Sequence, residues 1–103
     1  MDIYRSSQVF PIEERFGLQS QLRRAAVSVA SNIVEGCARR HPREYRSFLN
    51  IATGSSAEAL YLLTIAVRLG LLSATDSERL SQGYAELTAA LKSLLRALEQ
   101  RAD

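Results

Sequence analysis

The side chains best suited to chemistry in this chain lie between residues 37 and 46. Cys37 and His41 are its single cysteine and single histidine, and together they supply at most two of the about four ligands that a zinc site needs. No acidic residue adjoins His41 to make it a general base, and neither a glycine-rich phosphate loop nor a nucleophile with a matched base is present. We therefore expect no catalysis, no metal site and no cofactor.

Arginines are the other feature of this segment. The stretch CARRHPREYR holds four of them around the predicted start of a helix, and an antiparallel last helix would bring two more back to the same end. Guanidinium groups and the free N–H groups of a helix start are both suited to phosphate. The candidate nucleic-acid-binding residues are therefore Arg39, Arg40, Arg43, Arg46, Arg96 and Arg101. Two other interpretations stay open: an ordinary solvated helix end, or arginines that pair with acids of a neighbouring subunit.

The composition favours a small helical protein. Alanine, leucine, arginine, glutamate and serine are abundant, whereas glycine is limited to five residues and proline to two. A length of 103 residues suits a single domain, over residues 1–103, with one modest core. The formal net charge of +2 does not by itself demand a nucleic-acid partner. The expected fold class is all-α, and any nucleic-acid binding must come from a local cluster of charge.

Nothing in the sequence predicts export or membrane insertion. The first twenty residues carry several charges and no apolar stretch long enough for a signal peptide. The most apolar stretch, ALYLLTIAV, is far shorter than the roughly 20 residues that span a bilayer. The single Cys37 has no disulfide partner within the chain and is expected to be a small buried or half-buried thiol. We expect a cytoplasmic protein with no membrane partner.

Four helical segments are predicted from the spacing of apolar residues and from start and stop signals. They are a short stub over residues 2–8 and three long helices over residues 18–39, 42–69 and 75–101. Pro11 separates the stub from the second segment, because proline disfavours helical geometry in the residue before it. Pro42 suits a first helical position, Gly70 suits a C-terminal stop, and SATDSE offers caps for the last helix. The short turns make the long helices antiparallel neighbours.

The segment 42–69 has the most regular apolar stripe, with members three and four residues apart throughout, as at the seam of a helical bundle. These are Tyr45, Phe48, Ala52, Ser55, Ala59, Leu62, Ala66 and Leu69. Further apolar residues lie beside the seams, namely Leu49, Leu60, Leu63, Val67 and Leu95. Together they exceed what one small core is expected to hide, which favours a homo-oligomer.

The stretch RRAAVSVASNIVEG has almost no bulky side chain, and it faces a second small-residue stretch, ATGSSAEA, across the predicted hairpin. With the turn centred near Arg40, residue 26 lies opposite about residue 54, so the two backbones are expected to approach closely. Close contact would offset the cost of Gly54 inside a helix, which is about 1 kcal/mol relative to alanine.

The polar residues of the same two stretches are expected to hold the helices together. The hairpin register sets Arg23 and Arg24 near Glu58, which predicts a partly buried ion pair. Ser28, Asn32 and Glu35 follow one another at helical spacing, and such groups more often form hydrogen bonds between helices than active sites. We interpret the stretch as a packing surface.

The stretches FPIEERFGLQSQLRRAAVSVASNIVEGCAR and EYRSFLNIATGSSAEA resemble a known family. It is the four-helix bundle protein family that includes the 23S ribosomal RNA intervening-sequence proteins and the accessory proteins of diversity-generating retroelements. The matched patterns are F-P-x-E-E-R-x-G-L, R-R-A-x-x-S, S-N-I-x-E-G and F-L-x-x-A-x-G-S-x-x-E. The resemblance covers about residues 3 to 100.

The resemblance implies an antiparallel up-and-down four-helix bundle, commonly assembled as a homopentamer, without known catalysis. It also implies contact with nucleic acid or with a reverse transcriptase. Family members usually have a full first helix before the Phe-Pro, so a shortened first helix is expected here, or a start assigned too late. The family's signature positions carry over as structural residues: Arg23, Arg24, Ser28, Asn32, Glu35, Gly54, Ser55 and Glu58.

Two functions follow from these observations. The first is a non-enzymatic oligomeric bundle that binds RNA, DNA or a nucleic-acid-processing protein through its arginine-rich end. The second is a purely structural or protein–protein scaffold without nucleic-acid binding.

Overall fold

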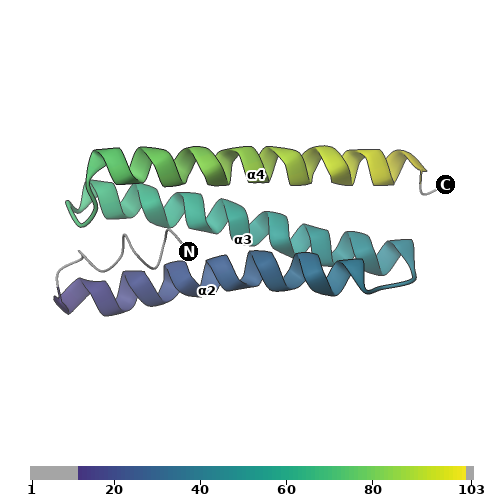
Figure 1. Ribbon diagram of the computed structural model, residues 1–103, viewed down its shortest axis with the longest axis horizontal. Helices are drawn as coiled ribbons and strands as arrows, with labels where there is room; N and C mark the ends of the chain where they lie inside the picture. Colours follow the sequence, from purple (N-terminus) through teal and green to yellow (C-terminus); the bar gives the residue numbers. More distant parts are fainter. Residues whose placement is uncertain (1–11, 102–103) are drawn as a thin grey trace.

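The computed structural model describes residues 12–101 of the chain, and side chains from residue 17 to residue 100. This part is all helical, with α2 at Ile12–Cys37, α3 at Pro42–Arg68 and α4 at Ala74–Arg101. Consecutive helices run antiparallel, with α3 in the middle (Figure 1). Both α2 and α4 pack along α3, and among the described residues their own backbones do not come into contact with each other. None of the described helices is long and apolar enough to cross a membrane.

The all-α class is therefore confirmed, with three helices in the described part of the chain. Helices α3 and α4 match the predicted bounds within one residue at each end. Helix α2 begins six residues before the predicted position 18 and continues through Gly17. Acidic residues at positions 13 and 14 favour a helix start there through the macrodipole, and one internal glycine costs only about 1 kcal/mol. The predicted stub over residues 2–8 lies outside the described residues, so the fourth helix stays a prediction.

The turn between α3 and α4 has the predicted stop and start signals. Gly70 has a φ of 71°, a left-handed conformation that favours glycine. The N–H of Leu71 donates to the Ala66 carbonyl at 2.9 Å and that of Gly70 to the Val67 carbonyl at 3.0 Å, which is a Schellman motif. The N–H of Asp76 then donates to the Ser73 hydroxyl at 3.1 Å, so Ser73 caps α4.

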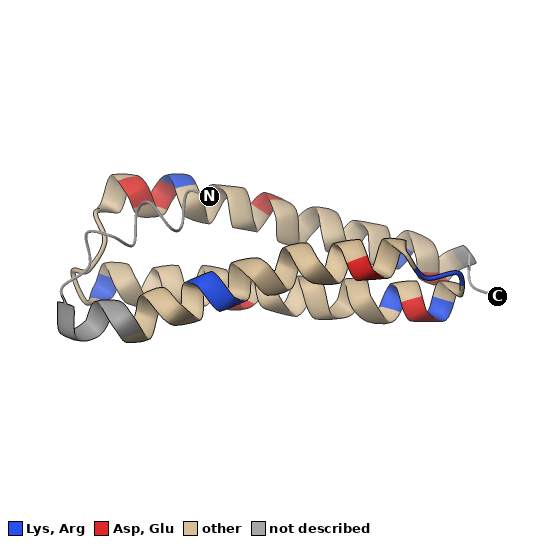
Figure 2. Cartoon of the chain, turned by 60° about the horizontal axis from the view of Figure 1, so that its bottom comes forward, with Lys and Arg blue, Asp and Glu red and all other residues tan. Residues whose placement is uncertain are grey.

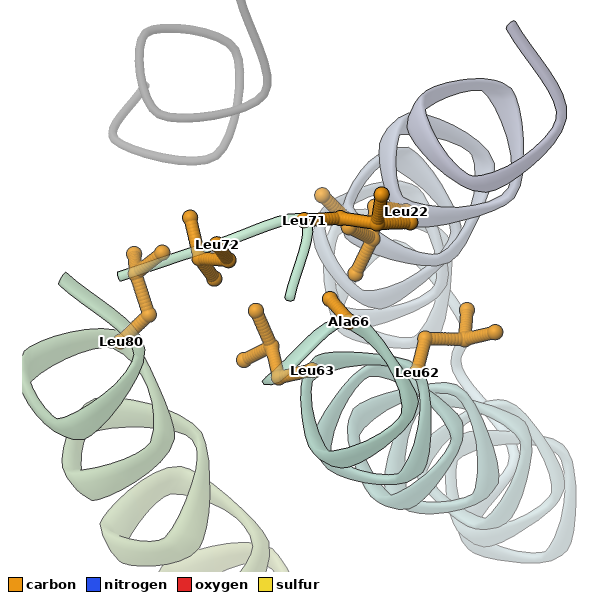
Figure 3. Packing of buried hydrophobic residues seen from close by; sticks show 8 residues of the cluster. Leu22, Leu62, Leu63, Ala66, Leu71, Leu72 and Leu80 are labelled. Carbon is orange, nitrogen blue, oxygen red and sulfur yellow. The ribbon is translucent and has the colours of Figure 1, made fainter. Parts of the chain in front are cut away.

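One core cluster lies at this end of the molecule. Leu22 of α2, Leu63 of α3 and Leu80 of α4 converge there on Leu71 and Leu72 of the turn (Figure 3). Both turn leucines are only 5% exposed, so they form part of the core. No periodic pattern marks them, because they lie between two helices.

A second core cluster fills the other half of the molecule. It consists of Leu49, Ala52, Leu91 and Leu95, with Ile33, Tyr45, Leu87 and Leu98 packed against it. The prediction that Leu49, Leu63 and Leu95 are surplus apolar residues is therefore wrong, because a single chain buries all three. Leu69, predicted as a seam member, is instead exposed, because it is the C-cap residue of α3.

Candidate nucleic-acid interface

The α2–α3 turn and the C-terminal end of α4 lie at the same end of the molecule (Figure 1). Leu98 of α4 lines a shallow pocket there together with Arg39, Arg40 and His41 of the turn and Tyr45 of α3. The antiparallel order of the helices thus places all six candidate arginines in the same half of the molecule. Arg101 is the last residue of α4, and its side chain is outside the described set.

Arg39 is the one candidate whose charge is balanced by a described neighbour. Its guanidinium donates to the Glu35 carboxylate at 2.8 Å, in an ion pair one helical turn apart. The same guanidinium lies over the Phe48 ring, 4.9 Å from the ring centre, which adds a cation–π contact. These contacts hold Arg39 in place, with its side chain still 40% exposed.

The other described candidates present free cations. Arg40, Arg43 and Arg96 are exposed and Arg46 is half-buried. The structure records no hydrogen bond or ion pair from these four side chains to any described residue. Acidic positions also lie at this end, namely Glu35, Glu44 and Glu99, so red and blue positions alternate there (Figure 2). The candidate interface is therefore a set of separate guanidinium groups interspersed with acids rather than a uniformly positive surface.

The start of α3 differs from the sequence-based expectation of free N–H groups. His41 is the N-cap residue, and its Nδ1 accepts a hydrogen bond from the N–H of Arg43 at 3.3 Å. Pro42 has no N–H, and Glu44 places an acid in the first turn. A phosphate would therefore find few free N–H groups here, and anion binding would depend on the arginine side chains.

The small-residue strip lies between α2 and α3, as predicted. The hydroxyls of Ser28 and Ser55 hydrogen-bond across the two helices at 2.7 Å. The Asn32 amide donates to the Ser28 carbonyl at 2.8 Å and to its hydroxyl at 3.1 Å, so Asn32 supports Ser28 from within α2. The predicted hairpin register is correct to within about one helical turn.

The close approach of the two helices occurs at Gly36 rather than at Gly54. A Cβ at Gly36 would lie 3.1 Å from the Phe48 Cβ and 3.2 Å from the Tyr45 Cδ1, whereas a Cβ at Gly54 would have no neighbour within 4 Å. The prediction for Gly54 is therefore wrong, because Gly54 lies on the exposed side of α3. Gly36 lies inside the helix predicted over residues 18–39, and the sequence pattern did not indicate this contact.

Two further sequence-based expectations are also wrong. Glu58 is exposed and makes no ion pair with Arg23 or Arg24 among the described side chains. Arg24 is exposed as well, and Arg23 is half-buried with contacts of its own. Cys37 is exposed rather than buried, because it lies at the end of α2 where the chain turns away from the core.

The most buried polar contact of the described residues was missed at the sequence level. The hydroxyls of Ser56 and Thr88 hydrogen-bond at 2.6 Å between α3 and α4, and Ser56 is fully buried. Thr88 also donates to the Tyr84 carbonyl at 2.7 Å. Two neighbouring serines gave no signal about which one faces α4, and the seam was assigned to Ser55. No group of three or more acidic, His or Cys side chains suited to a metal ion occurs among the described residues.

The helical hairpin, the Ser28–Ser55 contact and the Glu35 position belong to the stretches that carry the family resemblance. No curated protein matches this chain. Over residues 1–93, however, the chain matches the family described as 23S rRNA-intervening sequence protein. That match spans most of the chain and all of the signature positions, so the chain belongs to the 23S rRNA-intervening sequence protein family.

Proposed function

We propose that this protein is a non-enzymatic, homo-oligomeric helical module that binds nucleic acid through its arginine-rich end. The observation that carries the proposal is the set of unpaired guanidinium groups of Arg40, Arg43, Arg46 and Arg96. Arg43 lies in the first turn of α3, where the helix dipole disfavours a cation by about 0.3–1 kcal/mol. A bound polyanion would offset this repulsion, whereas the fold gains nothing from it.

The expected binding is weak in one subunit and strongly salt-dependent. Contacts from arginines to phosphates release counterions and carry little information on base sequence. Several subunits acting together would raise the apparent affinity by avidity. The family's name refers to a segment of 23S rRNA, which supports RNA as the first ligand to test. DNA and a reverse transcriptase are the other partners to compare.

The test compares two double variants that remove equal charge. Arg40→Gln with Arg43→Gln removes two exposed arginines of the candidate interface, and Arg68→Gln with Lys92→Gln removes two exposed cations outside it. Binding of a structured RNA and of duplex DNA is measured from low to physiological salt. The first variant is expected to bind at least about tenfold more weakly and to show a shallower salt slope, while the second stays close to wild type.

Equal losses in both variants would point to non-specific attraction by the net charge, and no binding by the wild type would reject the proposal. The scaffold alternative has its own support in the Arg39–Glu35 pair, which shows that an arginine at this end does pair with an acid. The scaffold alternative predicts that assembly is insensitive to salt and that freshly purified protein shows no excess absorbance at 260 nm.

A further inference from the structure

The shallow pocket at the arginine-rich end has an apolar inner wall. Gly36 of α2 is buried there, and Tyr45 of α3 and Leu98 of α4 are half-buried. The pocket has a volume of about 390 Å³. This volume lies within the range of about 300–1,000 Å³ that is common for small-molecule sites. We call it the turn pocket, because the α2–α3 turn forms its rim.

The rim of the turn pocket is cationic. Arg39 and Arg40 line it and are both exposed, and the exposed His41 lies beside them. None of the described residues that line the pocket is acidic, although acids occur elsewhere at this end of the molecule. A ligand that fits the pocket must therefore combine an uncharged apolar body with a negative group beside it.

Contacts within the chain hold the walls of the pocket in place. The Arg39 guanidinium is fixed by its ion pair and its cation–π contact, and the His41 side chain is fixed as the N-cap of α3. The Tyr45 ring lies against the α2 backbone at Gly36, where a Cβ would come 3.2 Å from the Tyr45 Cδ1. Binding therefore orders few side chains, which keeps its entropic cost low.

We propose that the turn pocket binds the base of an unpaired nucleotide in a strand of nucleic acid. A nucleobase is a flat body that stacks on aromatic side chains, and the phosphates on either side of it supply the negative charge. A base inside a duplex is paired and stacked between its neighbours, so it cannot enter the pocket. The inference rests on the proposed nucleic-acid binding and names its ligand class, which is nucleic acid with unpaired bases.

The arginines and the apolar wall have different parts in this recognition. Arg40 lies on the rim and Arg43 follows directly after Pro42 of the pocket lining, and neither side chain has an ion pair with a described residue. These guanidinium groups attract single strands and duplexes alike, because both offer phosphates. Only a single strand can also place a base against Tyr45. Stacking depends little on salt, so the preference for a single strand is expected to grow as salt rises.

The chain offers a way to block the pocket without changing its charge. Cys37 is the only cysteine of the chain, is exposed, and lines the pocket. N-ethylmaleimide adds a neutral group to its sulfur. We measure the affinity for a fluorescent single-stranded RNA and for a duplex at physiological salt, before and after labelling. The ratio of single-strand to duplex affinity is expected to fall at least about fivefold, which corresponds to the loss of one stacked base.

The matched control is Cys37→Ser with Ala85→Cys, which moves the thiol to an exposed position of α4 outside the pocket lining. Each protein is compared with itself before and after labelling, and the ratio of affinities in this control is expected to stay the same. A bound single strand is also expected to slow the reaction of Cys37 with the maleimide. It is not expected to slow the reaction of the thiol at position 85.

Tyr45→Leu tests the aromatic wall independently. It keeps an apolar side chain in the second core cluster and removes the ring. The ratio of single-strand to duplex affinity is expected to fall at least about fivefold. Circular dichroism shows whether the variant is folded, and the labelling experiment on the wild type decides the question if it is not.

A ratio of affinities that labelling leaves unchanged would overturn the pocket inference, and the arginine-rich interface would stand. Displacement of the strand by an equal nucleotide concentration of free AMP would overturn it as well, since the site would then be one for free nucleotides. The two proposals fail separately. A pocket that labelling blocks, together with unchanged binding by Arg40→Gln with Arg43→Gln, would reject only the role of the arginines. A wild type that binds neither nucleic acid would overturn both.

Discussion

The buried residue Gly36 lies in the last turn of α2, and its surroundings explain why no side chain occupies that position. The first turns of α3 begin only a few residues later in the chain and pack against it through Phe48 and Tyr45. The Cβ of Phe48 is fixed by the α3 backbone and has no rotamer with which to move away. Gly54 is also helical, but the space beside it is open. Glycine is therefore required for packing at position 36 and not at position 54.

Gly36→Ala is expected to lower the free energy of unfolding by about 1 kcal/mol, because overpacking against Phe48 exceeds the helix-propensity gain. Gly54→Ala is the matched control and is expected to raise it by up to about 1 kcal/mol. Urea unfolding of both variants measures the difference. Equal stabilisation by both would show that α3 relaxes around the new methyl group.

At the scale of helices, α3 is held to its two neighbours by different polar contacts. It meets α2 through the half-buried Ser28–Ser55 pair and α4 through the buried Ser56–Thr88 pair. Adjacent serines on α3 thus point to different neighbours. Because Ser56 is fully buried, its hydroxyl is costly to leave without a partner, and the pair helps to set the register of α3 against α4.

Thr88→Val keeps the side-chain volume and removes the hydroxyl, and it is expected to destabilise the fold by about 1–2 kcal/mol. Ser56→Ala is expected to cost about 1 kcal/mol. The double variant is expected to cost less than the two single losses together, by at least about 0.5 kcal/mol, because the two hydroxyls satisfy each other. Strict additivity in this double-mutant cycle would show that each hydroxyl depends on the Tyr84 carbonyl alone.

At the scale of the whole molecule, the described helices α2 and α4 each pack on α3, but their backbones do not pack on each other. Helix α3 packs on both neighbours, whereas α2 and α4 are joined through α3 and through the turn leucines at one end. The molecule measures 49 × 19 × 17 Å along its principal axes, so it is elongated (Figure 1). Either α2 or α4 can therefore separate from α3 while the other helix stays packed.

Native-state hydrogen exchange is expected to show that α3 is more resistant to local opening than α2 and α4. Amides in the middle of α3, around Ala59 and Leu63, should exchange slowest, at the rate set by global unfolding. Amides in the middle of α2 and α4 should exchange at least about tenfold faster through partial opening. Uniform protection of all three helices would show that they unfold as one cooperative unit.

The amino-acid sequence by itself determined the all-helical class, the bounds of α3 and α4, the Gly70 stop and the family. These follow from local signals: apolar residues three and four apart, a glycine after a helix, and contiguous motifs. The arginines of CARRHPREYR were likewise placed at one end from chain order alone, because short turns force antiparallel helices.

Only the tertiary structure decided which side chains are buried and which are exposed. Glu58 and Cys37 proved exposed, Gly36 rather than Gly54 proved tightly packed, and Leu71 and Leu72 joined the core from a turn. Helical spacing locates a face only to within about one residue step, or roughly 100° of rotation. Whether a side chain on the flank of that face is buried depends on the neighbouring helix, its distance and its rotation, and the spacing of residues along one helix contains none of these.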